Sequence, residues 1–344
     1  MNDNPNRLNV SAGRVSRSRG LSIIIAGLLL CHPLVSGQKT GDRSSDERIS
    51  NSPNGIRSSE IREVTFSCLN NQKRKVRKGK KSYDICKVGN RGIGNGVNFY
   101  SLQREQKIGR KLAEEVERDA QVVTNAEVND YIAQLGERLA YNSDTTRPIV
   151  IKVLLEDEVN AFSLEGGHLY VDTGLILKAD NEAQLAAVVA HEIAHAAARH
   201  CTKRDTESTL AVATSPLLVM QPLLRSKYSR NSEREADLLG IEYQYLSGYD
   251  PLEMIQFLEK IGDANQKPAF IVRPFSSYPS ISERIEDIQK DIQRYLPHRD
   301  QYVIDTAAFE QVKSTIRDLV DAEKHRCRTD CGFVSVVGSA RINK

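Results

Sequence analysis

The most constraining feature of this sequence is the stretch from Leu185 to Ala198. Every residue in it is Leu, Ala, Val or Ile except His191, Glu192 and His195. An apolar helix of this kind is buried over most of its surface. Two imidazoles and a carboxylate are costly to bury unless a partner compensates for them. A metal dication with its water is the simplest partner, whereas the alternative is a polar stripe that faces solvent on a partly buried helix.

The three polar residues have the spacing HExxH. His191 and His195 are four residues apart, so their side chains lie one above the other on a helix and can reach the same ion. Glu192 is one residue further round, where it can contact a water molecule on the metal without binding the metal itself. The pattern therefore predicts a hydrolytic metal site. A metzincin site requires Gly at position 198 and His at position 201, and the chain has Ala198 and Cys201 there, which excludes that class.

A tetrahedral zinc site needs a further protein ligand, and an acidic segment downstream offers candidates. Glu233 and Asp237 are again four residues apart on an expected helix. One of these carboxylates can bind the metal while the other orients a ligand histidine. Glu235 points to another face of that helix and is not the expected ligand. Without the HExxH motif, such an acidic cluster would indicate only a solvated helix face.

At this point the sequence resembles the gluzincin peptidases of family M48. The resemblance covers about residues 98–296. It rests on four segments, which are HEIAHAAARH (191–200), SEREADLLG (232–240), NAFSLEGGHLYVDTGLI (160–176) and SSYPSISERI (276–285). The first two segments together are highly specific for that family.

The resemblance implies a zinc endopeptidase that holds one Zn²⁺ per chain. His191, His195 and Glu233 would be the zinc ligands and Glu192 the general base. Asp237 would be the hydrogen-bond partner of a ligand histidine. The segment 166–172 would be an edge strand that pairs with an extended polypeptide substrate by β-addition.

One position departs from the family pattern. Many soluble members have a His before the Pro of the last segment, and that His approaches the metal. Here Tyr278 precedes Pro279, so a histidine above the zinc is not expected. We hypothesise that the Tyr278 hydroxyl stabilises the oxyanion or occupies the site at rest, and a Tyr that only packs in a loop is the alternative. His200 also matches the family and is interpreted as structural.

Residues 1–37 have the features of a secretory signal peptide. Three arginines lie between positions 14 and 19, the apolar run Leu21–Leu30 follows, and small residues precede Gln38. Ten apolar residues are too few to span a bilayer comfortably. Cys31 is the candidate for lipidation in an alternative lipoprotein signal. The expected location is therefore periplasmic or outer-membrane-associated, with secretion as a further alternative.

The remaining chain divides into three parts. Residues 38–97 form a basic, cysteine-containing linker or N-terminal region, residues 98–325 the metallopeptidase domain and residues 326–344 a C-terminal tail. In an oxidising compartment the simplest disulfides join Cys68 to Cys86 and Cys327 to Cys331, which leaves Cys201 unpaired. Four cysteines allow other pairings, and a cysteine-ligated zinc ribbon is a competing interpretation.

Apolar periodicity and capping residues predict mainly helices with a small sheet, which is an α+β fold, and the resemblance implies that this fold is zincin-like. The strands are expected at about 149–155 and 168–171. The helices are expected at about 102–120, 125–141, 182–200, 231–246, 251–262, 280–295 and 305–324. The segment Thr209–Leu224, between the two motif helices, is a candidate for capping the cleft or for peripheral contact with a membrane.

Charge distribution argues against nucleic acid as a partner. Residues 1–100 carry 18 basic and 7 acidic side chains, whereas residues 101–344 carry 30 and 38, so the predicted catalytic part is acidic. The predicted function is zinc-dependent hydrolysis of misfolded or envelope proteins, with Glu192 as the general base. The alternative is a non-catalytic, zinc-binding chaperone or assembly factor of the cell envelope.

Overall fold

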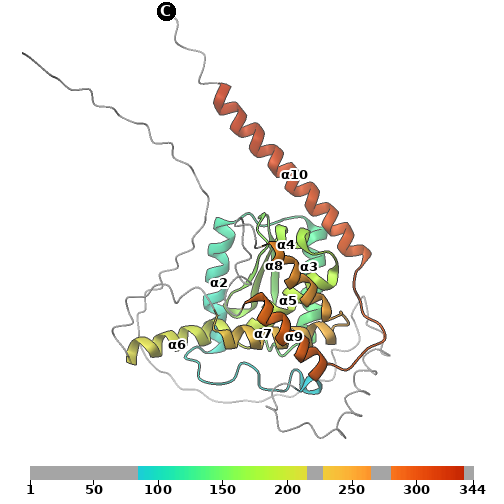
Figure 1. Cartoon of the computed structure of the whole chain (residues 1–344). Coiled ribbons are helices and arrows are strands. Elements are labelled where there is room, and N and C mark those ends of the chain that lie inside the picture. The colour runs from blue at the N-terminus through green and yellow to red at the C-terminus, as the bar shows by residue number, and fades with distance from the viewer. Residues whose placement is uncertain (1–83, 215–227, 265–279, 337–344) are drawn as a thin grey trace, which may run out of the picture. The chain divides into compact units, whose positions relative to one another are not determined.

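The computed structural model describes residues 84–214, 228–264 and 280–336 of the 344-residue chain (Figure 1). All of these belong to one compact unit, Ile56–Lys344. Several predicted features lie outside the described residues. These are the signal peptide, Cys31, Cys68, Tyr278, the side chains of Cys327 and Cys331, and the side chains of Thr209–Leu224.

Helices account for most of the described chain, as the sequence predicted. The long ones are α2 (Leu102–Asp119), α3 (Ala126–Tyr141), α5 (Glu182–Ala197), α6 (His200–Thr214), α7 (Arg230–Leu246), α8 (Leu252–Ala264), α9 (Ile281–Tyr295) and α10 (Ala307–Val336). The short helix α4 is Thr173–Lys178, and single 3₁₀ turns lie at η2 (Ile85–Lys87) and η3 (Glu165–Gly167). Side-chain caps from Ser101, Asn125, Asn181 and Ser280 satisfy free backbone N–H groups where four of the helices begin.

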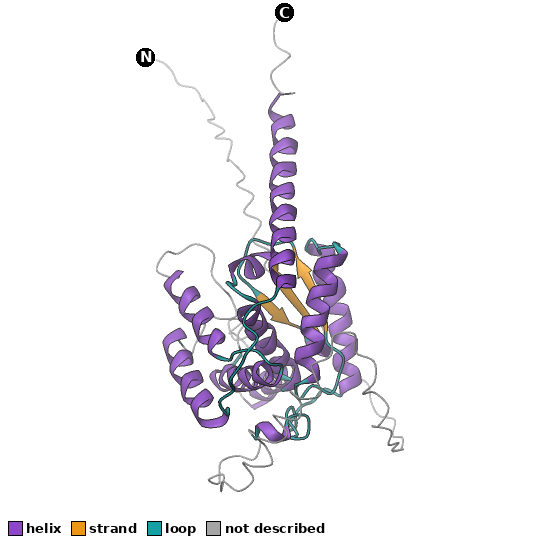
Figure 2. Ribbon diagram, turned by 90° about the vertical axis from the view of Figure 1, so that its right-hand side faces the viewer, coloured by secondary structure: helices purple, strands orange, loops and turns teal. Residues whose placement is uncertain are grey.

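The sheet has three strands in the order β1-β3-β2 (Figure 2). β1 (Val150–Leu154) pairs parallel with β3 (His168–Asp172), and β2 (Ala161–Ser163) pairs antiparallel with β3. The expectation that 166–172 contains the edge strand was therefore wrong, because β3 is central. β2 folds back on β3 in a hairpin and β1 covers the other side of β3, which leaves β2 as the edge strand nearest to α5. The fold is α+β, which confirms the predicted class.

Helix α5 lies at the centre of the core. All sixteen of its residues are buried, and it contacts α3, α7, α8 and β2. The closest helix pair is α5 and α7, because Gly240 of α7 lies against the backbone of His191. Burial on every side therefore explains the apolar composition of Leu185–Ala198, as the sequence indicated.

The predicted helix 182–200 is two helices in the structure. α5 ends at Ala197 and α6 begins at His200, because Arg199 adopts a left-handed backbone conformation with φ of 58°. This conformation is uncommon for a residue with a side chain. The break changes the chain direction immediately after the HExxH motif.

The segment before α2 is anchored to the core by buried charges. The side chain of Arg91 is fully buried and contacts Asp144 at 2.5 Å and Glu242 at 2.6 Å. Nearby, Cys86 is disulfide-bonded, whereas Cys201 is a free thiol, as predicted. Residues 84–100 are therefore held against the folded unit by these contacts.

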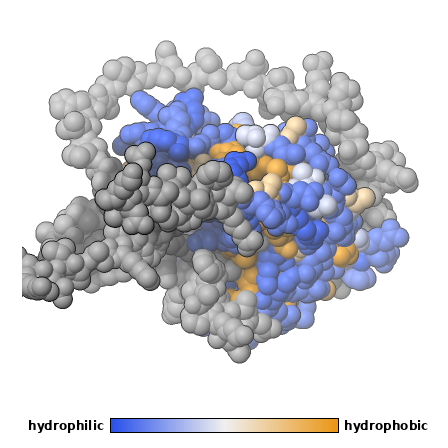
Figure 3. All heavy atoms as spheres, turned by 90° about the horizontal axis from the view of Figure 1, so that it is seen from above, coloured by the Kyte–Doolittle hydropathy of each residue, from blue (hydrophilic) through white to orange (hydrophobic). Residues whose placement is uncertain are grey.

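The face seen in Figure 3 is mostly hydrophilic, with smaller apolar patches between the hydrophilic residues. Helices that are both long enough and apolar enough to span a bilayer do not occur within the described part of the chain.

Candidate metal centre

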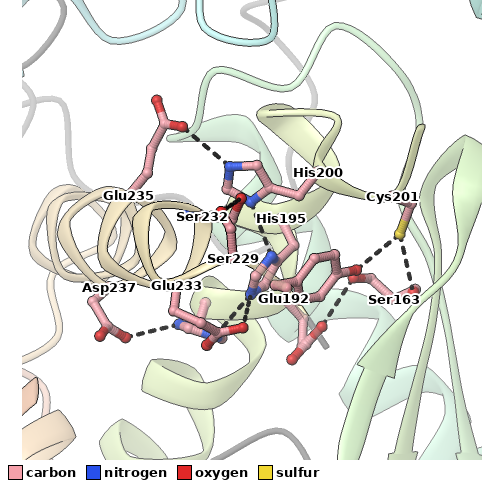
Figure 4. Close-up of polar contacts among 12 residues, drawn as sticks. Ser163, Glu192, His195, His200, Cys201, Ser229, Ser232, Glu233, Glu235 and Asp237 are labelled. Atoms are coloured by element: carbon pink, nitrogen blue, oxygen red, sulfur yellow. Dashed lines mark hydrogen bonds and ion pairs between the residues drawn. The ribbon is translucent and has the colours of Figure 1, made fainter. Parts of the chain in front are cut away.

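The structure brings His191, His195 and Glu233 together in the core, and all three are buried (Figure 4). The two histidines project from successive turns of α5, and Glu233 projects from the first turn of α7. The Nε2 atoms of the histidines are 3.0 Å apart. Glu233 Oε2 lies 3.6 Å from His191 Nε2, and Glu233 Oε1 lies 3.7 Å from His195 Nε2.

These distances fit a cation held by all three side chains. Ligand atoms at about 2.0–2.1 Å from a tetrahedral zinc ion are about 3.3 Å from each other. The three measured separations fall on either side of that value. Within the described residues, Glu233 Oε2 is buried and accepts no hydrogen bond. A buried carboxylate oxygen without a donor is costly, and a cation at this point removes that cost.

His191 is held in place by a chain of buried charges. Its Nδ1 lies 3.0 Å from Asp237 Oδ1. Asp237 in turn accepts hydrogen bonds from Arg284 of α9, at 2.9 Å from Nε and 2.5 Å from Nη2. Burial opposes ionisation of Asp237, but Arg284 and His191 lower the pKa of Asp237 to about 2. An ionised Asp237 holds the hydrogen of His191 on Nδ1, so that the Nε2 lone pair faces Glu233.

Glu192 lies beside this group with its side chain almost fully buried. Ser163, the last residue of β2, donates its hydroxyl hydrogen to Glu192 Oε2 at 2.9 Å. Burial is the main cause that raises the pKa of Glu192 to about 7. A carboxyl group with this pKa accepts and returns a proton at neutral pH.

A second hydrogen-bonded chain supports His195. His195 Nδ1 lies 2.9 Å from His200 Nδ1, and His200 Nε2 lies 3.1 Å from Glu235 Oε2. Sequence reasoning treated His200 as structural and placed Glu235 on another face of its helix. Glu235 is indeed outside the ligand group, but it contacts the centre through His200.

Tyr228 closes another side of the centre. Its ring stacks on that of His195 with 4.0 Å between the centroids. The Tyr228 hydroxyl is 2.8 Å from the sulfur of Cys201, and that thiol points toward the backbone oxygen of Ser163 at 3.8 Å. Tyr228 was not singled out from the sequence, because no spacing relates it to the HExxH motif.

Sequence reasoning thus selected five residues that the structure places in one buried group, and it assigned no role at the centre to four that surround them. The five are His191, Glu192, His195, Glu233 and Asp237. The four are Ser163, His200, Tyr228 and Arg284. The segment that contains Arg284 was noted as part of a motif, but a contact with Asp237 depends on how α9 packs on α7.

An HExxH helix whose histidines share a buried centre with a glutamate from a later helix defines a metallopeptidase fold. The family model for peptidase family M48 matches residues 126–292 of this chain, which confirms the predicted resemblance to that family.

Individual relatives agree with this assignment. Beta-barrel assembly-enhancing protease of Yersinia pestis is 27% identical over 222 residues, which are 58% of this chain and 46% of that protein. The protein of the same name from Escherichia coli (strain K12) is 27% identical over 221 residues, 57% of this chain and 45% of the relative. Mitochondrial metalloendopeptidase OMA1 of Arabidopsis thaliana is 35% identical over 123 residues, 33% of this chain and 25% of the relative. The match therefore spans less than half of each of these proteins.

Proposed function

We propose that this protein is a zinc-dependent endopeptidase that holds one Zn²⁺ through His191, His195 and Glu233. The observation that carries the proposal is the buried group formed by these three side chains, with Glu192 directly beside it. Bound zinc supplies Lewis acidity toward a peptide carbonyl and toward water.

Glu192 is the general base in this proposal. It takes a proton from the attacking water and returns it to the leaving amine, so no covalent intermediate is needed. Its pKa of about 7 suits both transfers. The Ser163 hydroxyl fixes one of its oxygens, and Asp237 fixes the orientation of His191.

The proposed substrate is a polypeptide bound in extended form. β2 is the edge strand nearest to the centre, and its last residue contacts Glu192 directly. A substrate that adds to the free edge of β2 would therefore pass beside the general base. This assigns to β2 the role that the sequence had suggested for 166–172.

The proposed physiological role is proteolysis of misfolded or envelope proteins in an exported enzyme, in the periplasm or at the outer membrane. The signal-like N-terminus and the names of the relatives, with beta-barrel assembly among them, support this role. Peripheral contact with a membrane and a part for Tyr278 in the site remain hypotheses that rest on the sequence alone.

The test combines zinc content with casein hydrolysis for the purified chain and its Glu192→Gln variant. We expect one zinc per chain in both proteins, and cleavage that is sensitive to chelator in the wild type only. Loss of a general base lowers the rate about 10²- to 10⁴-fold. Glu114→Gln is the matched control, because Glu114 is exposed on α2.

Two results would contradict the proposal. Absence of zinc from the wild type would remove the metal centre altogether. Zinc without cleavage in either form would favour the alternative of a non-catalytic chaperone or assembly factor.

A further inference from the structure

We propose that His200 is the positioning residue of the ligand His195, and that Arg199 and Glu105 hold His200 in place. This inference rests on the proposed zinc centre, because it concerns how one of the zinc ligands is held. Apart from His195 itself, the residues that take part in it lie outside the group of five that the sequence selected.

The hydrogen-bond directions follow from the role of His195. If the Nε2 lone pair of His195 faces Glu233 and the metal, its ring hydrogen is on Nδ1. The only atom within hydrogen-bond distance of that Nδ1 in the described residues is His200 Nδ1, at 2.9 Å, which then acts as the acceptor. The hydrogen of His200 is consequently on Nε2, and it is donated to Glu235 Oε2 at 3.1 Å. One set of tautomers therefore satisfies both imidazoles.

The break between α5 and α6 makes this contact possible. In an uninterrupted helix a residue five positions after His195 lies about 140° round the axis, so its side chain points elsewhere. The left-handed conformation of Arg199, with φ of 58°, turns the chain back toward His195. His200 follows directly and is 2% exposed.

Arg199 is held in this conformation by a clamp from another helix. Its guanidinium donates to Glu105 of α2, with Nε at 2.7 Å from Oε1, and to the backbone oxygen of Tyr100 at 2.5 Å. Glu105 is itself buried, and it accepts further hydrogen bonds from Arg147 and Thr202. A strained backbone persists at a functional site when the surrounding contacts over-determine it. Here these contacts keep the His200 imidazole aimed at His195.

The two ligand histidines thus have different supports. His191 Nδ1 contacts the carboxylate of Asp237, whereas His195 Nδ1 contacts a second imidazole. Partners of this kind fix ring orientation, and their removal typically weakens metal binding about 10- to 100-fold. A residue that merely fills space at position 200 would have no such effect on the metal.

The test uses two amide substitutions that separate the two contacts of His200. In His200→Asn the amide oxygen can occupy the place of Nδ1 and accept from His195. In His200→Gln the amide reaches the place of Nε2 and keeps only the contact with Glu235. The measurements are the zinc dissociation constant, by competition with a chromophoric chelator, and the visible absorption spectrum of the cobalt-substituted protein.

We expect His200→Asn to bind zinc within about threefold of the wild type and to keep its cobalt spectrum. We expect His200→Gln to bind zinc about 10- to 100-fold more weakly, with an altered spectrum. His298→Gln is the matched control, since His298 is exposed. Thermal unfolding of each metal-free variant reports any general loss of structure.

Failure of this inference is distinguishable from failure of the proposed function. If the wild type binds no zinc, the zinc centre and this inference both fail. If the wild type binds zinc and cleaves casein but the two variants bind zinc equally well or equally badly, the positioning role alone is overturned.

Discussion

Asp172 shows how strongly this fold can change the ionisation of one side chain. It ends β3, its exposed fraction is 3%, and its Oδ1 accepts no hydrogen bond within the described residues. Burial raises the pKa of this carboxyl group to about 7, with a smaller contribution from Glu156, although a hydrogen bond from Asn160 opposes the shift. In the unfolded chain an Asp has a pKa of about 3.9.

The sign of the resulting pH dependence follows from proton binding. Between about pH 4 and pH 7 the folded state keeps the Asp172 proton and the unfolded state does not. Raising the pH through this interval therefore lowers the free energy of unfolding, by up to about 4 kcal/mol. We expect Asp172→Asn to lose this part of the pH dependence, as measured by denaturant unfolding at pH 4 and pH 8 in the presence of chelator.

The comparison needs a control because other groups also titrate in this interval. Asp321→Asn removes an exposed carboxylate of α10, and it should keep the pH dependence of the wild type. Equal pH dependence in Asp172→Asn and the wild type would contradict the shifted pKa.

At the scale of elements, the centre depends on how closely α5 and α7 approach. A Cβ atom at Gly240 would lie 3.1 Å from His191 Cα and 3.2 Å from His191 N. Only a residue without a side chain allows the two backbones to come this close. Because α7 also provides Glu233, the same approach sets the separation between the glutamate and the histidines.

A pair of glycine substitutions tests this packing. Gly240→Ala places a methyl group against backbone, and we expect it to destabilise the fold by about 1–3 kcal/mol, despite the higher helix propensity of Ala. In the matched control Gly262→Ala, the new Cβ meets a side chain and not backbone, since it lies 3.3 Å from Cγ2 of Ile281. This control should be neutral or stabilise the fold by up to about 1 kcal/mol. Equal free energies of unfolding for the two variants would show that contact with the His191 backbone is not what requires glycine at position 240.

The long elements were predictable because their signals are local. Amphipathic periodicity and the Asn181 cap located where the predicted helices begin to within a few residues, whereas α6 was not predicted and α10 continues beyond the predicted end at 324. The three-residue β2 was missed because it is too short to show alternation. The order of the strands also escaped prediction, since it depends on which strand pairs with which and not on local composition.

The metal-binding group was predictable for the same reason. His191 with His195, and Glu233 with Asp237, are each four residues apart on a helix, and such pairs can be recognised in sequence. The contact between His200 and His195 could not be predicted, because it depends on the left-handed conformation of Arg199. No Gly or Pro marks that break, and the contacts that maintain it come from Glu105, more than ninety residues earlier.

At the scale of the whole molecule, residues 84–100 complete the core through charge. Arg91 contacts Asp144, which follows α3, and Glu242 in α7. Tyr243 also donates its hydroxyl hydrogen to Asp144 at 2.9 Å. Removing one partner from a buried group of ions leaves the others uncompensated.

We therefore expect Arg91→Met to lower the free energy of unfolding by about 3–5 kcal/mol. Denaturant unfolding monitored by circular dichroism provides the measurement. Arg110→Met serves as the control, because Arg110 is exposed on α2 and should tolerate the change with little effect. Similar unfolding free energies for the two variants would show that Arg91 is not an anchor.

The Arg91 anchor also has a consequence for the order of folding. Its partners lie 53 and 151 residues later in the chain. During synthesis the segment around Arg91 emerges first, and its contacts are complete only once Asp144 and, later, Glu242 of α7 have been made. Contacts between residues so far apart in the sequence form slowly, because the chain loses the entropy of closing the intervening loop before the contacts can stabilise it. We therefore expect residues 84–100 to become native late in the folding of this unit.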